Sequence, residues 1–429
     1  PRSTLFPYTT LFRSETLIED GAGRGLVVDL RQNPGGLLDQ AVDVSNLFVS
    51  EGNLVVTEGE GQRMRQEYDA DGDAPFAELP LVVLIDGGSA SAAEIVAGAL
   101  KNNDRAVVVG TTSFGKGTVQ VLYDVADAAL KLTVAQYLTP GDLSIQGVGV
   151  SPDLELLPVA VGKRHVTMGL LDERRPRDPK RRLEAFGAVS HDLPAQRLFY
   201  LVEDVQETDD DEDEPPIEDT EKFRRDEVID MAAVLVRHLG GPVGRSGLPM
   251  AQQALADWTA AQDGRIAAQL GTWGADWSAG PGRPDGPVRI DWSVLPAGPL
   301  KAGGEVRLRL SAVNEGTVPL FRTHCLTESD NGFLDGLEFV FGRLEPGKPV
   351  AREVPLKVPM DAWDRSDQVR FRLFQQEQES ASPPPVRVRV EGLPRPRFAY
   401  AFQVLDSGGD GRLHRSEEHT SELQSRQSI

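Results

Sequence analysis

The sequence has one cysteine, no long apolar run and a deficit of positive charge, and each shortage excludes a class of protein. Cys325 is the only cysteine among 429 residues, so neither an internal disulfide nor a cysteine-based zinc site can form. No apolar run approaches the ~18 residues that span a membrane as a helix. The formal net charge of −21 repels nucleic acid and anionic lipid, so we expect neither as a partner.

The two ends of the sequence differ in character from the rest. Residues 1–14 and 415–429 resemble in-frame translations of sequencing-library adapters, and we set them aside as foreign to the fold. The intervening residues 15–414 suffice for two to four domains at ~100–200 residues each. With hydrophobic residues at 40% of the chain, these domains can build real cores. We treat residues 401–414 as a truncated tail.

Residues 25–157 alternate between strand and helix patterns. Short, almost fully apolar runs are typical of strands buried on both faces, and amphipathic stretches between them predict covering helices. The expected buried strands are 26–30, 81–86 and 106–109; the helices are 38–49 and 91–101; the alternating strands are 53–57, 64–68, 118–123 and 129–137. This pattern predicts a layered α/β domain, to which we assign residues 15–160.

The next region, residues 161–287, combines charge blocks with helices. Residues 163–182 hold eight Lys or Arg against three acids, and residues 203–221 hold twelve acids and no base. Such blocks predict solvated linkers or disordered loops, although they could pair with each other or attract calcium. Two helices are expected at 221–239 and 249–270, followed by a connector rich in glycine and proline.

Residues 288–400 read as short alternating strands separated by turns, which predicts a β-sandwich. The turns are 314–316 and 345–347, and the strands are 305–312, 336–341, 350–358, 369–373 and 386–390. The Asn-Glu-Gly-Thr turn after the first of these strands, with a later Leu-x-Pro-Gly turn, resembles Ig-like adhesion modules of bacterial surface proteins. Such a module would serve binding rather than catalysis.

Ser91 and Lys116 are the residues that point to chemistry. Residues 15–157 contain no histidine, so a Ser-His-Asp triad is excluded there, and a serine needs another base to remove its proton. Lysine acts as that base only in its neutral form, which burial favours. We therefore expect Lys116 to be shielded from water, with Phe114 beside it and the Gln120 amide holding the amine or the substrate.

An oxyanion site is predicted beside Ser91. Ser91 begins a helix, so the N–H of Ala92 can donate to a negatively charged oxygen. A second donor would come from Gly35 or Gly36, in the turn after the first buried strand. One such donor contributes ~3–4 kcal/mol of transition-state stabilisation.

Each piece also has a structural explanation. Ser91-x-x-Glu94 is a helix capping box, and Lys116 taken alone is a turn lysine. Residues 110–117 nearly match a phosphate-binding loop, but Gly117 replaces its hydroxyl residue and a strand pattern follows. Residues 406–412 faintly resemble a calcium loop without a clear closing carboxylate before residue 415. Only the combination favours catalysis.

Four motifs together resemble the carboxy-terminal processing, or tail-specific, peptidases. They read GLVVDLRQNPGG (25–36), SASAAEIVAGAL (89–100), TSFGKGTVQ (112–120) and SIQGVGVSPD (144–153). The resemblance implies a ClpP/crotonase-like layered fold, Ser91 as nucleophile, Lys116 as general base and Gln120 as the residue that orients it. It also implies an oxyanion hole from the glycine turn and Ala92, with no metal or cofactor.

The resemblance extends to partners and surroundings. It implies a serine endopeptidase that cleaves proteins near exposed C-terminal tails outside the cytoplasm, as in the periplasm or cell envelope, and an oligomer is possible. Members commonly carry a PDZ domain and further strands before the motif that begins here at Gly25, so we expect the sequence to be a fragment. They also carry Asp where this chain has Asn102, which would weaken an ion pair with Arg105. The alternative is a catalytically inactive scaffold whose β-sandwich binds surfaces.

Overall fold

The computed structural model describes residues 25–59, 64–125, 128–162, 166–169, 188–189, 193–202, 226–280, 286–376, 378–380 and 383–393. The adapter-like ends, the acidic run 203–221, the calcium-like loop 406–412 and most of the basic stretch lie outside these residues. Within the described part of the chain, no helix is long and apolar enough to cross a membrane.

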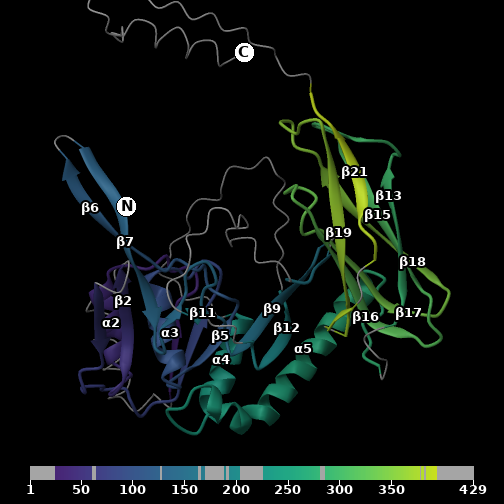
Figure 1. Cartoon of the computed structure of the whole chain (residues 1–429). Coiled ribbons are helices and arrows are strands. Elements are labelled where there is room, and N and C mark those ends of the chain that lie inside the picture. Colours follow the sequence, from purple (N-terminus) through teal and green to yellow (C-terminus); the bar gives the residue numbers. More distant parts are fainter. Residues whose placement is uncertain are drawn as a thin grey trace, which may run out of the picture.

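A mostly parallel sheet forms the centre of the α/β part (Figure 1). Its strands are β1 (Leu26–Asp29), β4 (Leu81–Ile85), β5 (Val107–Gly110), β9 (Leu154–Val161) and β10 (Val166–Thr167), in that order, and β12 (Gln196–Leu201) also pairs with β9. All pairings but β9–β10 are parallel. Every residue of β4 and β5 is buried, as the apolar runs predicted.

Helices cover both faces of this sheet, and a second sheet adds a further layer. Helices α2 (Leu38–Asn46) and α3 (Ala92–Asn102) share a core with Leu81, Val83 and Ile85, whereas α4 (Glu227–His238) packs on Val82 and Leu84. Strands β2 (Asn53–Gly59), β3 (Arg65–Asp69), β6 (Thr118–Val125), β7 (Ala128–Thr139), β8 (Leu143–Ser144) and β11 (Ala188–Val189) form the second sheet. The expectation of a mixed α/β fold is confirmed.

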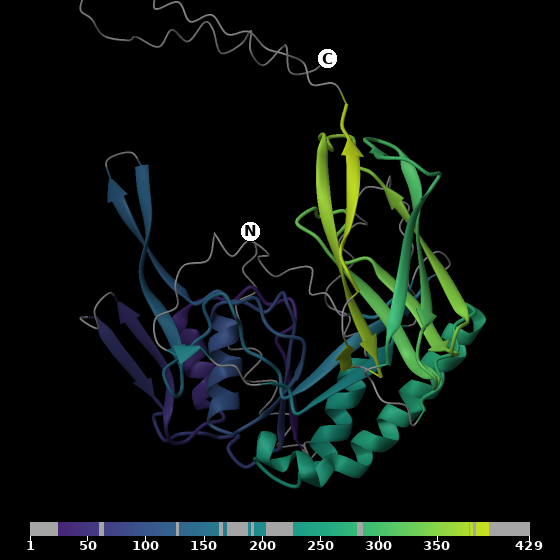
Figure 2. The same cartoon turned by 45° about the vertical axis from the view of Figure 1, so that its right-hand side comes forward.

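Strands β6 and β7 make a two-stranded ribbon that projects from the α/β body (Figures 1 and 2). The far end of β7 pairs with β2 at Val56–Gly59, so the ribbon is anchored in the second sheet at its base. Figure 2 shows that its outer part leaves the rest of the domain.

The region expected to hold linkers and helices contributes to the core in its described residues. Strand β12 extends the central sheet, and α4 covers it, so no boundary at residue 160 separates two cores there. The physical reason is that Met231, Ala232 and Leu235 of α4 bury the face that Val82 and Leu84 would otherwise expose. Helix α5 (Gln252–Thr272) then follows the short helix η3 (Arg245–Ala251) and packs on β12.

The last part of the chain forms two facing sheets around a core that includes Phe339, Phe341 and Phe371. One sheet holds β13 (Val288–Leu295), β15 (Glu305–Asn314) and β18 (Pro349–Lys357). The other holds β14 (Leu300–Lys301), β21 (Val386–Glu391), β19 (Arg365–Gln375), β16 (Leu320–Glu328), β17 (Glu338–Leu344) and β20 (Gln378–Ser380). The sequence analysis did not predict strand β16. This strand lies between β17 and β19 and is buried on both faces, so apolar and polar residues do not alternate along it.

A shared core attaches these sheets to the α/β part. Trp277 and Val340 pack with Leu157 and Val159 of β9 and with Ile266 of α5. The Met168 N–H donates to the Glu338 carboxylate, and Arg322 forms an ion pair with Asp263 at 3.0 Å. The side chain of Trp277 is 3% exposed and its ring lies 5.8 Å from that of His324.

Trp277→Ala should therefore lower the free energy of unfolding by about 3–5 kcal/mol, because it leaves a cavity where the two parts meet. Chemical denaturation followed by circular dichroism measures the change. Trp363→Ala is the matched control: its ring is 54% exposed beside Arg365, so the loss should not exceed about 1 kcal/mol. Equal losses in the two variants would contradict a shared core.

Candidate active site

Three of the four sequence motifs follow adjacent parallel strands. The glycine turn follows β1, the Ser91 segment follows β4, and the Lys116 segment follows β5, and these strands are neighbours in the order β1-β4-β5. Because the carboxyl ends of parallel strands lie at one edge of a sheet, segments far apart in sequence meet there. The topology therefore explains why the motifs converge.

Ser91 occupies a strained backbone conformation at the start of α3. Its φ is 57° and its ψ is −118°, a region that residues with a Cβ rarely adopt. Such conformations cost about 1–3 kcal/mol and persist only where the surroundings hold them, often at functional sites. A similar sharp strand-to-helix turn presents the serine nucleophile of the α/β-hydrolases. No local pattern in the sequence predicts this strain.

The buried carboxylate of Glu94 joins the serine segment to the lysine segment. One oxygen accepts the N–H of Ser91 at 2.8 Å and the N–H of Lys116 at 2.9 Å. The other accepts the Ser113 hydroxyl at 2.6 Å and the N–H of Gly115 at 2.7 Å. Burial raises the pKa of Glu94, while these four donors act in the opposite direction. The Ser-x-x-Glu pattern located this residue but assigned it only a capping role.

The fourth motif supports the loop that carries Lys116. The Gly147 N–H donates to the Gly115 carbonyl at 2.8 Å, and the Gly117 N–H donates to the Gln146 side chain at 2.9 Å. Gly115 has a φ of 90°, and a methyl group there would lie 3.0 Å from the nitrogens of Val148 and Gly149. The two glycines that flank the lysine are therefore required for close approach of two loops.

The glycine turn lies directly against Ser91. A methyl group on Gly35 would lie 2.7 Å from the Ala92 nitrogen and 2.8 Å from the Ser91 Cβ. The Gly35 N–H donates to the Asn33 side chain at 2.9 Å, whereas a methyl group on Gly36 would meet no atom within 4 Å. All three candidate oxyanion donors thus belong to one neighbourhood, and Gly35 already has an acceptor.

Ionic contacts hold the end of β1 in place. Arg31 binds Asp29 through two nitrogens, at 2.9 and 2.7 Å, and reaches Asp226 at the start of α4 at 2.8 Å. Next along the chain, Gln32 has a φ of 57°, and its N–H donates to the Asp86 carboxylate at 2.9 Å. The turn before the glycines is therefore fixed from both β4 and α4.

The side chains of Lys116 and Gln120 are exposed, contrary to the expectation of a shielded lysine. Among the described residues, neither a hydrogen bond nor an ion pair is formed by the Lys116 ammonium, and none joins it to Ser91 or Gln120. The Gln120 amide instead donates to the Thr133 hydroxyl of β7 at a long 3.4 Å. Lys116 lies on the outer side of its loop because the inner side is filled by backbone contacts to residues 146–149.

The Asn102 substitution has a structural counterpart. The Asn102 amide donates to the Thr139 hydroxyl at 3.0 Å and to the Pro140 carbonyl, which ties α3 to the end of β7. Arg105 is buried and donates to the carbonyls of Phe48, Phe76 and Leu79, and desolvation lowers its pKa to about 10. The Nη1 of Arg105 has no acceptor among the described residues. The asparagine at position 102 therefore changes the support of α3 and not the surroundings of Ser91.

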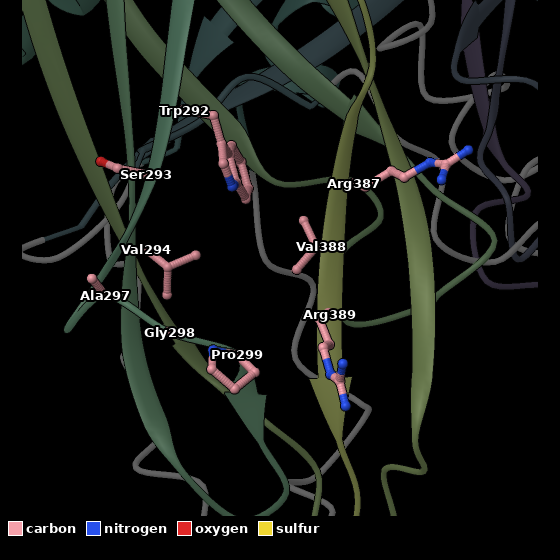
Figure 3. Close-up of a pocket in the computed structure, with 9 residues that line it drawn as sticks. All are labelled: Trp292, Ser293, Val294, Ala297, Gly298, Pro299, Arg387, Val388 and Arg389. Atoms are coloured by element: carbon pink, nitrogen blue, oxygen red, sulfur yellow. The ribbon is translucent and has the colours of Figure 1, made fainter.

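Metal-ligating groups and grooves are two further features by which a functional site can be recognised among the described residues. Within the described residues, no group of three or more His, Cys, Asp or Glu side chains could hold a metal ion. A groove of about 450 Å³ lies instead in the sandwich, where Trp292 and Val294 of β13 face Val388 of β21 (Figure 3). It opens where the chain crosses from β13 to β14 and lies outside the neighbourhood of Ser91.

Comparison with known proteins identifies the region around Ser91. Residues 14–156 match the family model "Peptidase family S41". This region is similar to the S41 peptidases, and we call it the S41 domain. A carboxy-terminal-processing protease of Bartonella bacilliformis is 48% identical over 150 residues, which cover 34% of this chain and 35% of that protein. The carboxyl-terminal-processing protease of Synechocystis sp. is 42% identical over 137 residues, which cover 32% of each chain.

A solved structure, the photosystem II D1 C-terminal processing protease, is 40% identical to the S41 domain, covering 33% of this chain and 37% of that chain with a TM-score of 0.32. The chain therefore spans about a third of the length of the relatives that it matches. The sequence matches over residues 14–156 are to the family expected from the motifs.

Glu94→Gln should destabilise the S41 domain by about 1–3 kcal/mol. An amide has one acceptor oxygen and an NH₂ group, so two of the four donors would face another donor. Thermal unfolding by calorimetry measures the loss. Glu67→Gln, which removes an exposed carboxylate paired only with Arg65, should change stability by no more than about 1 kcal/mol. Equal shifts would show that Glu94 does not join the two segments.

Gly35→Ala should destabilise the S41 domain and displace Ser91. The φ of 94° costs an alanine about 1–2 kcal/mol, and the new methyl group overlaps the Ala92 nitrogen. Unfolding curves measure the loss of stability, and a crystal structure of the variant measures the displacement. Gly36→Ala, where no atom is within 4 Å, should keep wild-type stability; an equal loss there would contradict the steric argument.

Proposed function

We propose that the S41 domain hydrolyses peptide bonds with Ser91 as nucleophile and Lys116 as general base. The observation that carries this proposal is the Glu94 oxygen that accepts the N–H groups of both residues, at 2.8 and 2.9 Å. Two backbone segments that share one acceptor atom lie side by side, whatever the positions of their side chains. The strained Ser91 backbone and the identity of the relatives support the same assignment.

The reaction follows acyl-transfer chemistry. The neutral Lys116 amine takes the Ser91 hydroxyl proton while the oxygen attacks the substrate carbonyl carbon, and the negative charge develops on the carbonyl oxygen. The Ala92 N–H and a donor from Gly35 or Gly36 stabilise that oxygen. The Lys116 ammonium then protonates the leaving amine, the C–N bond breaks, and an ester to Ser91 remains. Water hydrolyses the ester by the same steps in reverse.

Substrate itself supplies the shielding that Lys116 needs. An extended peptide over the site excludes water from the amine and favours its neutral form. Gln120 lies four residues further along β6, and its long bond to Thr133 is weak enough to exchange for the lysine or the substrate. Gln120 is thus a positioning residue in this proposal.

The proposal extends to substrate, location and fold. By likeness to processing proteases, the substrates are proteins with exposed C-terminal tails. The location outside the cytoplasm rests on the resemblance of the four motifs alone. Two sheets with α2 and α3 between them support a ClpP/crotonase-like layering. In the last domain, the chain begins in one sheet at β13 and crosses to pair in parallel with β21 at β14, which supports an Ig-like sandwich.

Ser91→Ala should abolish cleavage of an unstructured protein, Lys116→Ala should slow it strongly, and both variants should keep the fold intact. Loss of the base alone should slow cleavage by about 10²–10⁴-fold. Gel analysis of substrate with time measures the rate, and circular dichroism checks folding. Lys131→Ala, an exposed lysine on β7, is the matched control and should retain activity.

The pH profile of the unsubstituted chain separates a lysine base from other mechanisms. Cleavage should rise with pH, because only the neutral amine accepts the Ser91 proton. A flat profile from about pH 6 to about pH 9 would contradict a lysine base. Unchanged cleavage by either alanine variant would contradict the dyad itself.

A further inference from the structure

One face of the β6–β7 ribbon is a ladder of exposed apolar side chains. Val121 and Tyr123 of β6 are 37% and 46% exposed, and Leu130 and Leu132 of β7 are 49% and 43% exposed. Val121 lies opposite Leu132, and Tyr123 lies opposite Leu130. Because residues two apart in a strand share a face, all four point to the same side of the ribbon. We call these four residues the ribbon ladder.

The outer edge of β6 is open and unprotected. Over the described residues, β6 pairs with β7 and with no other strand. Proteins usually blunt such an edge with proline, charge or a bulge. Residues 118–123 read TVQVLY, without proline or charge, and the one charged residue of β6, Asp124, stands at its outer end. The irregularity in the ribbon falls in β7, where Val134 is the extra residue. This edge is therefore suited to accept another strand.

The open edge is continuous with the proposed catalytic site. Strand β6 begins at Thr118, two residues after Lys116, and carries Gln120. A chain that pairs with β6 therefore reaches the lysine at the base of the ribbon. Figures 1 and 2 show the ribbon leading away from the α/β body that holds this site.

We propose that the ribbon binds the extended substrate as an added antiparallel strand and selects apolar side chains through the ribbon ladder. This inference rests on the proposed function for its location at the site. An antiparallel strand runs toward Lys116, so residues N-terminal to the scissile bond lie along β6. Val121 and Tyr123 stand five and seven residues beyond Lys116. The selected positions are therefore about four to seven residues before the scissile bond.

The chemistry of the ladder defines the occupant. Cross-strand apolar neighbours stabilise a sheet, and the four ladder residues carry no charge or hydrogen-bonding group except the Tyr123 hydroxyl. An exposed apolar face of this kind on a folded domain marks a binding surface. Substrate segments rich in Val, Ile, Leu or aromatic residues fit it, whereas acidic or polar segments gain no contact.

The test measures binding without catalysis. Ser91→Ala in the 429-residue chain prevents turnover, and fluorescence anisotropy then gives the Kd of two labelled peptides that differ only upstream, Val-Ile-Val-Leu against Ser-Gln-Ser-Gln. The apolar peptide should bind at least about tenfold more tightly. Adding Tyr123→Thr and Leu130→Thr, which keep the strand propensity, should bring the ratio to within about twofold of one.

Lys131→Thr is the matched control, because Lys131 lies on the opposite face of β7 and should leave the ratio unchanged. An unchanged ratio in the double ladder variant, equal weakening of both peptides, or no binding of either peptide would overturn the inference. So would a dimer, seen by light scattering, that the double variant breaks without altering the ratio. A normal ratio with no cleavage by the unsubstituted chain would support the ladder and contradict only the proposed function.

Discussion

The arrangement at the sheet edge depends on one buried carboxylate, that of Glu94. Removing an ion of this kind from water costs several kcal/mol unless partners compensate. Here the Ser113 hydroxyl and the three backbone N–H groups of Ser91, Gly115 and Lys116 provide that compensation, at 2.6–2.9 Å. Hydrogen bonds to a charged group contribute about 1.5–3 kcal/mol each, so the set of four donors offsets that cost. The carboxylate thus requires that the two segments, 22 or more residues apart, be placed together.

The strain at Ser91 follows from the same constraint. Two contacts hold the Ser91 backbone at its φ of 57°. Its N–H donates to Glu94 on one side, and on the other side it lies so close to Gly35 that a Cβ on residue 35 would not fit. The Ser91 backbone cannot relax toward a helical conformation without breaking its hydrogen bond to Glu94 or separating from Gly35. The serine is therefore presented by its surroundings, and the energy stored in its backbone comes from the Glu94 network and from the packing of β1 against β4.

The sequence predicted the strands and helices whose hydrophobic pattern is distinct along the chain. The fully apolar strands β4 and β5 and the helices beside them have the expected places because burial on both faces leaves a continuous apolar run. The motifs likewise located Ser91, Lys116 and the glycine turn. The position of β12 in the central sheet, the non-alternating strand β16 and the exposure of Lys116 were not predictable. Each depends on contacts between distant segments, and no local pattern records them.

The proposed dyad and the proposed substrate strand together give the exposed Lys116 and the uncovered ribbon one physical explanation. A lysine that acts as a base must be shielded from water, and an apolar edge strand is stabilised by a partner strand. Both features lie within the eight residues from Lys116 to Tyr123. A permanent cover over the lysine would shield it but would block the substrate. If the substrate strand covers both, neutralisation of the lysine and burial of the ladder occur in one step. Binding energy from remote apolar residues is then used to activate the base, which makes the length and the apolar character of the substrate part of the catalytic requirement.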